Sequence, residues 1–354
     1  MIDTKNYKDK LKFTITLIFI FTGVYFVSFY SKIISTGIKE GLKLCTTTLV
    51  PSLFMFMILS DIIANSKAVH RFCHLFKKPF YKLTKLPSEC IVVLLMSVIG
   101  GYPVGAKCTI ALLKNTSITK SEAEKLSLMA VSSGFGFVVN FVAISIFNNR
   151  YIGYVLMISQ LVAFLVNVVL CCVFIKTDDE INRFNSTKEK YTLIDSVSNG
   201  TKATINMCAM VILFSGILSV AKVFFSDSPF VYDLVCMILE VTNATKNICM
   251  RYPLWVTSFV LSFSGLCVHF QIFAILRDIN VNKCLFFIFR IISGIISALS
   301  TYILLKISSE TVAVFSTVDT TEIENSTTVW GSIALMLTGI SFLNSLKISK
   351  HIRR

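Results

Sequence analysis

Long apolar runs recur along the chain, and short loops rich in lysine and arginine separate them. Several of these runs approach the ~20 apolar residues that an α-helix needs to cross a bilayer. The composition agrees, because 54% of the 354 residues are hydrophobic and 15% are charged, whereas soluble domains carry about 25% charged residues. The sequence therefore predicts an all-α, polytopic membrane protein in a lipid bilayer, with no room for a large soluble domain.

The formal net charge of +14 has a membrane explanation. In a soluble protein such an excess would suggest nucleic acid binding. Here the basic residues lie between apolar runs, where they orient helices during insertion. We therefore expect no nucleic acid partner. The eleven cysteines are scattered without a CxxC pair, so we expect buried apolar thiols, no metal and no cofactor. Because no catalytic motif is visible, we do not expect an enzyme.

Eight full membrane spans are expected. They lie at residues 13–30, 49–65, 126–147, 151–175, 203–225, 253–277, 285–305 and 328–346. We interpret 13–30 as a retained first span, because it is long for a signal peptide and no A-x-A site follows. The apolar spacing of residues 31–48 predicts an interfacial amphipathic helix.

Two further apolar stretches, 90–115 and 229–246, do not read as simple spans. Glycines and a proline interrupt the first, and acidic residues interrupt the second. Loop charges place both chain ends in the cytoplasm, so each stretch must enter and leave the membrane on one side. This predicts an inverted-topology repeat with a re-entrant hairpin in each half, a pattern of secondary transporters.

The predicted organisation has five parts. They are an N-terminal span (1–30), a first repeat (31–175), a cytoplasmic linker (176–202), a second, inverted repeat (203–305) and a C-terminal span with a basic tail (306–354). Two of the full spans also contain a small, polar interruption. The candidate binding residues there are Ser132, Ser133, Gly134 and Asn140 in one span, and Ser264, Gly265, His269 and Gln271 in the other. Matching interruptions in both halves point to a binding site, although small residues also serve helix packing.

The hairpins supply the remaining candidates. Gly101, Tyr102, Pro103 and Lys107 belong to the first, and Glu240, Thr242 and Asn243 belong to the second. A charge at membrane depth costs roughly 2.5–3.5 kcal/mol on insertion scales, so it usually has a function or a partner. Lys107 could hold an anionic substrate together with helix-terminal N–H groups, or reach the headgroups. Glu240 could carry a coupling proton, bind Na⁺ or neutralise Lys107. We expect Arg290 to snorkel from the end of its span.

Four motifs resemble a known family. GGYPVGAK (100–107), SSGFGF (132–137), EVTNA (240–244) and SFSGLCVHFQ (262–271) are similar to the YlbJ family of sporulation integral membrane proteins. The resemblance implies a duplicated nucleoside-recognition, or Gate, domain, similar to the core of concentrative nucleoside transporters. It also implies a place in the mother-cell-derived outer forespore membrane and movement of dipicolinic acid across it.

Three functions follow as expectations. The first is a secondary transporter of a small organic anion, with dipicolinic acid as the implied substrate. The second is a transporter of a nucleoside or another metabolite. The third is a non-transporting scaffold for assembly of the spore envelope. The sequence leaves open whether transport is coupled to H⁺ or Na⁺, and whether the chain forms a homo-oligomer.

Overall fold

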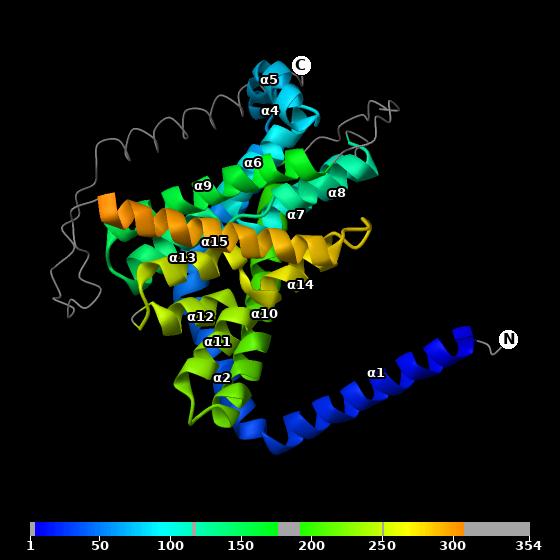
Figure 1. Cartoon of the computed structure of the whole chain (residues 1–354), viewed down its shortest axis with the longest axis vertical. Coiled ribbons are helices and arrows are strands. Elements are labelled where there is room, and N and C mark those ends of the chain that lie inside the picture. Colours follow the sequence, from blue (N-terminus) through cyan, green and yellow to red (C-terminus); the bar gives the residue numbers. More distant parts are fainter. Residues whose placement is uncertain (1–3, 115–117, 176–191, 250, 308–354) are drawn as a thin grey trace. The chain divides into compact units, whose positions relative to one another are not determined.

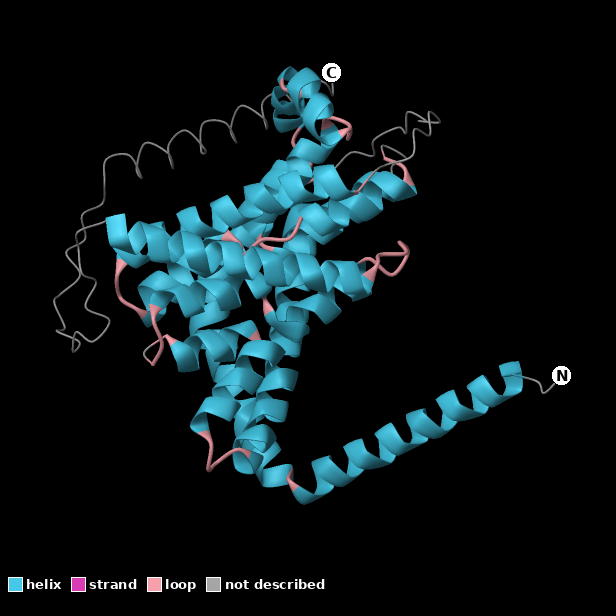
Figure 2. Ribbon diagram, in the orientation of Figure 1, coloured by secondary structure: helices cyan, strands magenta, loops and turns pink. Residues whose placement is uncertain are grey.

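A computed structural model describes residues 4–114, 118–175, 192–249 and 251–307. Within these ranges the regular elements are helices, and none is a strand (Figures 1 and 2). The elements are α1 Thr4–Phe29, α2 Ser31–Leu44, η1 Cys45–Leu49, α3 Val50–Ala64, α4 Lys67–Leu75, α5 Lys77–Thr84, α6 Glu89–Gly100, α7 Tyr102–Lys114, α8 Lys120–Met129, η2 Gly136–Ile146, α9 Arg150–Phe174, α10 Leu193–Phe224, α11 Pro229–Leu239, α12 Val241–Ile248, α13 Leu254–Phe263, α14 Gly265–Ile275 and α15 Lys283–Ile307. The predicted all-α class is confirmed.

In this described part, five helices are long and apolar enough to cross a membrane. They are Ser31–Ile63, Arg150–Phe174, Leu193–Phe224, Leu254–Ile275 and Lys283–Ile307. A sixth is gained if the bent pair α5 and α6 is counted as one span. Three of these helices agree closely with the spans predicted at 151–175, 253–277 and 285–305. The span predicted at 328–346 lies outside the described residues, and the total of eight spans stays a prediction.

The interfacial helix predicted at 31–48 is wrong. α2 continues through the π-helical turn η1 into α3, so Ser31–Ile63 is one long helix. The small residues of α2 face α10, and the two helices run side by side in Figure 1. A Cβ atom added at Gly37 would lie only 2.5 Å from the carbonyl oxygen of Ser215. The face of α2 that carries its small residues therefore packs against a neighbouring helix rather than against lipid headgroups.

Two other boundaries differ from the prediction. α10 begins at Leu193, where the Thr192 and Asp195 side chains form a reciprocal N-terminal cap, so the end of the predicted linker 176–202 is helical. Residues 176–191 of that linker lie outside the described residues. The span predicted at 13–30 falls in α1, whose apolar part, Thr16–Phe29, is shorter than the other candidates.

Both predicted interruptions of full spans are present. The predicted span 126–147 consists of α8 and the π-helix η2, which the irregular segment 130–135 separates. The span Leu254–Ile275 is divided into α13 and α14 at Ser264, which adopts the left-handed conformation with φ 72°. Helices α9, α13 and α15 pack together around these interruptions (Figure 1). The interruptions therefore lie within the helical core.

Candidate functional site

The first predicted hairpin is a helix, a break and a second helix. Gly101, with φ 85°, ends α6, and α7 begins at the next residue. Ser97 and Gly105 would be ~12 Å apart along one straight helix. In the structure a Cβ added at Gly105 would collide with the Ser97 hydroxyl. The chain therefore folds back on itself at Gly101.

The second predicted hairpin is built in the same way. Glu240 has extended backbone angles and separates α11 from α12. The Asn247 side-chain amide of α12 lies 3.6 Å from the Cys236 sulfur of α11. Near the open end, Arg251 pairs with the buried Asp233 at 3.2 Å. Both stretches are thus folded-back hairpins, and their re-entry into the membrane stays a prediction.

The four breaks meet in two pairs. Gly101 of the first hairpin touches Gly134 of the irregular segment, since a Cβ added at Gly134 would lie 2.7 Å from the Gly101 nitrogen. Gly265, with φ 70°, touches the second hairpin, since its added Cβ would lie 3.2 Å from the Glu240 nitrogen. We call the Gly101–Gly134 contact the first crossing and the Glu240–Gly265 contact the second crossing. In each of them backbone meets backbone.

Hydrogen bonds link the two halves of the chain. The Tyr102 hydroxyl at the first crossing donates to the carbonyl oxygen of Leu261 in α13. The Gln160 side-chain oxygen in α9 accepts from both Ser133 and Ser262, each at 2.7 Å. Its amide nitrogen donates to the Ser258 carbonyl at 3.1 Å and to a hydroxyl of α15 at 2.8 Å. Gln160 is not among the residues selected from the sequence, although a polar residue inside an apolar run is a signal that could have found it.

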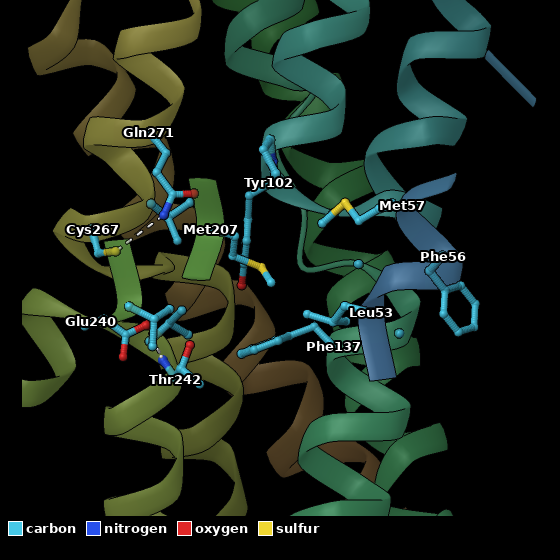
Figure 3. Close-up of a pocket in the computed structure, with 18 of the residues that line it drawn as sticks. Leu53, Phe56, Met57, Tyr102, Phe137, Met207, Glu240, Thr242, Cys267 and Gln271 are labelled. Atoms are coloured by element: carbon cyan, nitrogen blue, oxygen red, sulfur yellow. Dashed lines mark hydrogen bonds between the residues drawn. The ribbon is translucent and has the colours of Figure 1, made fainter. Parts of the chain in front are cut away.

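A cavity lies where the breaks meet (Figure 3). Its lining includes seven predicted site residues: Gly101, Tyr102, Pro103, Gly134, Glu240, Thr242 and Gln271. Apolar side chains from α3, η2, α10 and α14 complete the wall. The cavity volume is about 40 Å³, which is room for about three water molecules. A solute larger than this needs the surrounding helices to separate.

Glu240 is buried and closes the N-terminus of α12. Its two carboxylate oxygens accept from the backbone N–H groups of Thr242 at 2.8 Å and Asn243 at 2.6 Å. The Asn243 side chain also donates to Glu240 at 2.8 Å and to Ser215 of α10 at 2.9 Å. A carboxylate at a helix N-terminus is stabilised by these donors and by the helix dipole. The N–H groups of α12 are therefore engaged by the chain's own carboxylate.

The structure does not bring Lys107 into this cavity. Lys107 is half-buried on α7, and its charged neighbours are Asp61 of α3 and Lys202 of α10. Among the residues that the structure describes, no ion pair joins Lys107 to Glu240. The charge predicted to hold an anion thus lies outside the cavity lining.

Other predicted residues have packing contacts. His269 donates to the carbonyl oxygen of Phe263 at 2.9 Å and lies edge-to-face against three phenylalanine rings. Asn140 reaches the Ser52 carbonyl at 3.4 Å. Ser264 forms the turn of the second crossing, and its hydroxyl reaches back to Ser262. None of these three predicted residues lines the main cavity.

The expectation that Arg290 snorkels is wrong. Its side chain is 2% exposed, and one of its terminal nitrogens donates to the Val131 carbonyl at 2.7 Å. Arg290 lines a second, smaller cavity together with Ser132 and Gln160. The position near a helix end suggested snorkelling, and only the long-range contact with the irregular segment reveals the buried site.

The interrupted, bilayer-length helices define a multi-pass α-helical membrane protein. The chain is similar to the sporulation integral membrane protein YlbJ of Bacillus subtilis (strain 168), with 26% identity over 313 residues, which are 76% of each chain. This similarity supports the YlbJ-like family that the motifs indicated. No family model and no solved structure matches the chain.

Proposed function

We propose that the protein is a secondary transporter of a small organic anion. The observation that carries this proposal is the convergence of four helix interruptions, two from each half of the chain, around one cavity. Irregular backbone at membrane depth is tolerated where it is buried in protein or lines a cavity. Discontinuous helices from two repeats meet in this manner in secondary transporters. Dipicolinate is the anion that the motif resemblance implies.

A membrane scaffold would not require this arrangement. A scaffold can be assembled from continuous helices, whose backbone groups are satisfied internally. Here Gly101 and Gly265 adopt positive φ angles, and Glu240 is 1% exposed. A buried charge and interrupted helices are costly in a membrane. A binding site explains why the protein contains both.

Movement of the hairpins would open the cavity. Its present volume of about 40 Å³ is too small for a pyridine ring with two carboxylates. α6–α7 and α11–α12 each contact the rest of the core through a crossing, so displacement of either hairpin would widen the cavity from one side. Alternating access by such displacement requires no nucleotide hydrolysis. Glu240, at the second crossing, is the proposed carrier of a coupling H⁺ or ligand of Na⁺.

A second candidate substrate, a neutral nucleoside, is favoured by the lining of the main cavity. Among the described residues, Glu240 is the charged group in that lining, and no lysine or arginine joins it. Tyr102 and Phe137 offer aromatic surface, while Gln271 and Thr242 offer hydrogen-bonding groups (Figure 3). A base and a ribose match this set without needing a positive charge.

Uptake by the purified full chain in liposomes tests the proposal. Labelled dipicolinate and labelled nucleosides are offered separately, with imposed proton or Na⁺ gradients, and protein-free liposomes provide the background. We expect uptake of dipicolinate above that background. Uptake of nucleosides alone would select the second candidate. Absence of uptake of both solutes, by protein shown to be folded, would overturn the transporter proposal.

A further inference from the structure

The buried guanidinium of Arg290 is only partly satisfied. One terminal nitrogen, Nη1, donates to Val131, whereas Nε and Nη2 have no hydrogen-bond partner. The ion pairs among the described residues are Arg251–Asp233 and Arg277–Asp278, and neither includes Arg290. A buried charge without a counter-charge is strongly unfavourable. The missing counter-charge must therefore come from outside this part of the chain.

The free edge of Arg290 has a defined chemical preference. Nε–H and Nη2–H lie on the same side of the planar guanidinium and form a two-donor fork. Such a fork matches the two oxygens of a carboxylate. Ser293, one turn further along α15, is 3% exposed, and its hydroxyl also has no partner. Three unsatisfied donors are thus gathered within one helical turn.

These donors face a small cavity. Arg290 and Ser293 line it together with Val131, Ser132, Gln160 and Ser262. Its volume is about 10 Å³, enough for one water-sized group. Chloride and a carboxylate are both larger than a water molecule, so either needs a small displacement of the lining.

We propose that Arg290 and Ser293 bind a singly charged anionic group, either one carboxylate of the transported solute or free chloride. This inference deepens the proposed function, because it gives an organic anion the positive charge that the main cavity lacks. The irregular segment 130–135 joins the two places: it contributes Ser132 to the anion site and Gly134 to the first crossing. An anion at Arg290 would therefore lie against the same segment that lines the main cavity at Gly134.

Thermal unfolding of the purified full chain in detergent tests the site. The protein is held in sodium methanesulfonate at constant ionic strength, and chloride or dipicolinate replaces that salt stepwise. We expect the unfolding midpoint to rise with one or both anions and then saturate. A response to chloride alone assigns the site to a free anion, and a response to dipicolinate assigns it to the solute.

Three variants locate the effect. Arg290→Gln should abolish the anion dependence, and Ser293→Ala should weaken the apparent affinity several-fold. Arg277→Gln removes an arginine that is 82% exposed and should leave the response unchanged. The proposal is overturned if the wild-type midpoint ignores both anions, or if Arg290→Gln responds as the wild type does. If Arg290→Gln does not fold, an unchanged anion affinity in Ser293→Ala overturns it instead.

The liposome assay separates this proposal from the proposed function. Anion-dependent stability without uptake of any solute would refute transport and keep the site. Uptake of dipicolinate by a protein whose stability ignores anions would keep transport and refute the site.

Discussion

At the first crossing Gly101 lies against Gly134, whereas at the second crossing Gly265 lies against the backbone of Glu240. A Cβ atom would come within 2.7 Å of backbone at Gly134, but within 3.2 Å at Gly265. The first crossing carries no charge of its own, and the second holds a buried carboxylate. A close contact between two backbone segments thus allows tight packing in the first half of the chain, and in the second half it holds a buried carboxylate.

The largest effect is expected from Gly134→Val at the first crossing. A side chain there meets backbone of Gly101 that cannot swing away, so we expect a loss of about 3 kcal/mol or more of stability. Folded yield and the unfolding midpoint measure it. Gly216→Ala is the control, because its added Cβ has 3.4 Å of space and helical alanine is favoured over glycine. Equal behaviour of the two variants would contradict the close contact.

The next largest effect is expected from Gln160→Leu, which cuts the link between the halves. The Ser133 and Ser262 hydroxyls would lose their shared acceptor, at a cost of about 2 kcal/mol in unfolding free energy. Gln271→Leu serves as the comparison, because the Gln271 side-chain amide makes a weak 3.5 Å contact with the Cys267 sulfur. Denaturant unfolding in detergent would reveal the difference, and equal losses in both variants would argue against the link.

A smaller change in stability is expected from Glu240→Gln at the second crossing. The amide oxygen accepts from one of the two α12 N–H groups and the other loses its acceptor, so the loss should be about 1 kcal/mol. Gradient-driven uptake should nevertheless be largely lost, because the proposed coupling group is gone. The exposed Glu40→Gln is the matched control and should transport normally. Full coupled uptake by Glu240→Gln would remove this residue from the mechanism.

The smallest effect is expected from Lys107→Gln. Because Lys107 does not line either cavity, the anion dependence of the unfolding midpoint should match that of the wild type. Loss of the anion response in this variant, with Arg290 intact, would support the sequence-based prediction that Lys107 holds the anion. It would then place anion binding at the first hairpin.

Three of the four breaks were predictable because helix-breaking and small polar residues mark them directly, and the acidic Glu240 marks the fourth. Glycine, proline and serine clusters interrupt otherwise apolar runs at 100–107, 132–137 and 262–271. A local pattern of this kind predicts where a helix is interrupted, because the interruption depends on these residues themselves and not on their tertiary contacts. Their matching positions in the two halves predicted a shared binding site, but the contacts of Gly101 with Gly134 and of Gly265 with Glu240 were not predicted.

The partners of individual side chains were not predictable. The sequence of an amphipathic helix is the same whether its apolar face meets lipid headgroups or a neighbouring helix. The contact of Gly37 in α2 with α10 was therefore not predicted. Arg290 lies 159 residues from Val131, and nothing local to either residue indicates their contact. Lys107 misled for the same reason, because its nearness to a break in sequence does not place it in the cavity.

Cys267 provides the most direct test of the claim that a solute occupies the main cavity. This thiol lines the cavity and is 1% exposed. In a variant that keeps Cys267 alone, an anionic, membrane-impermeant thiosulfonate should block uptake, and saturating dipicolinate should slow that modification. A variant that keeps only the exposed Cys284 should react at a rate that dipicolinate does not change. Modification of Cys267 at one rate with and without every transported solute, or without loss of uptake, would contradict the account.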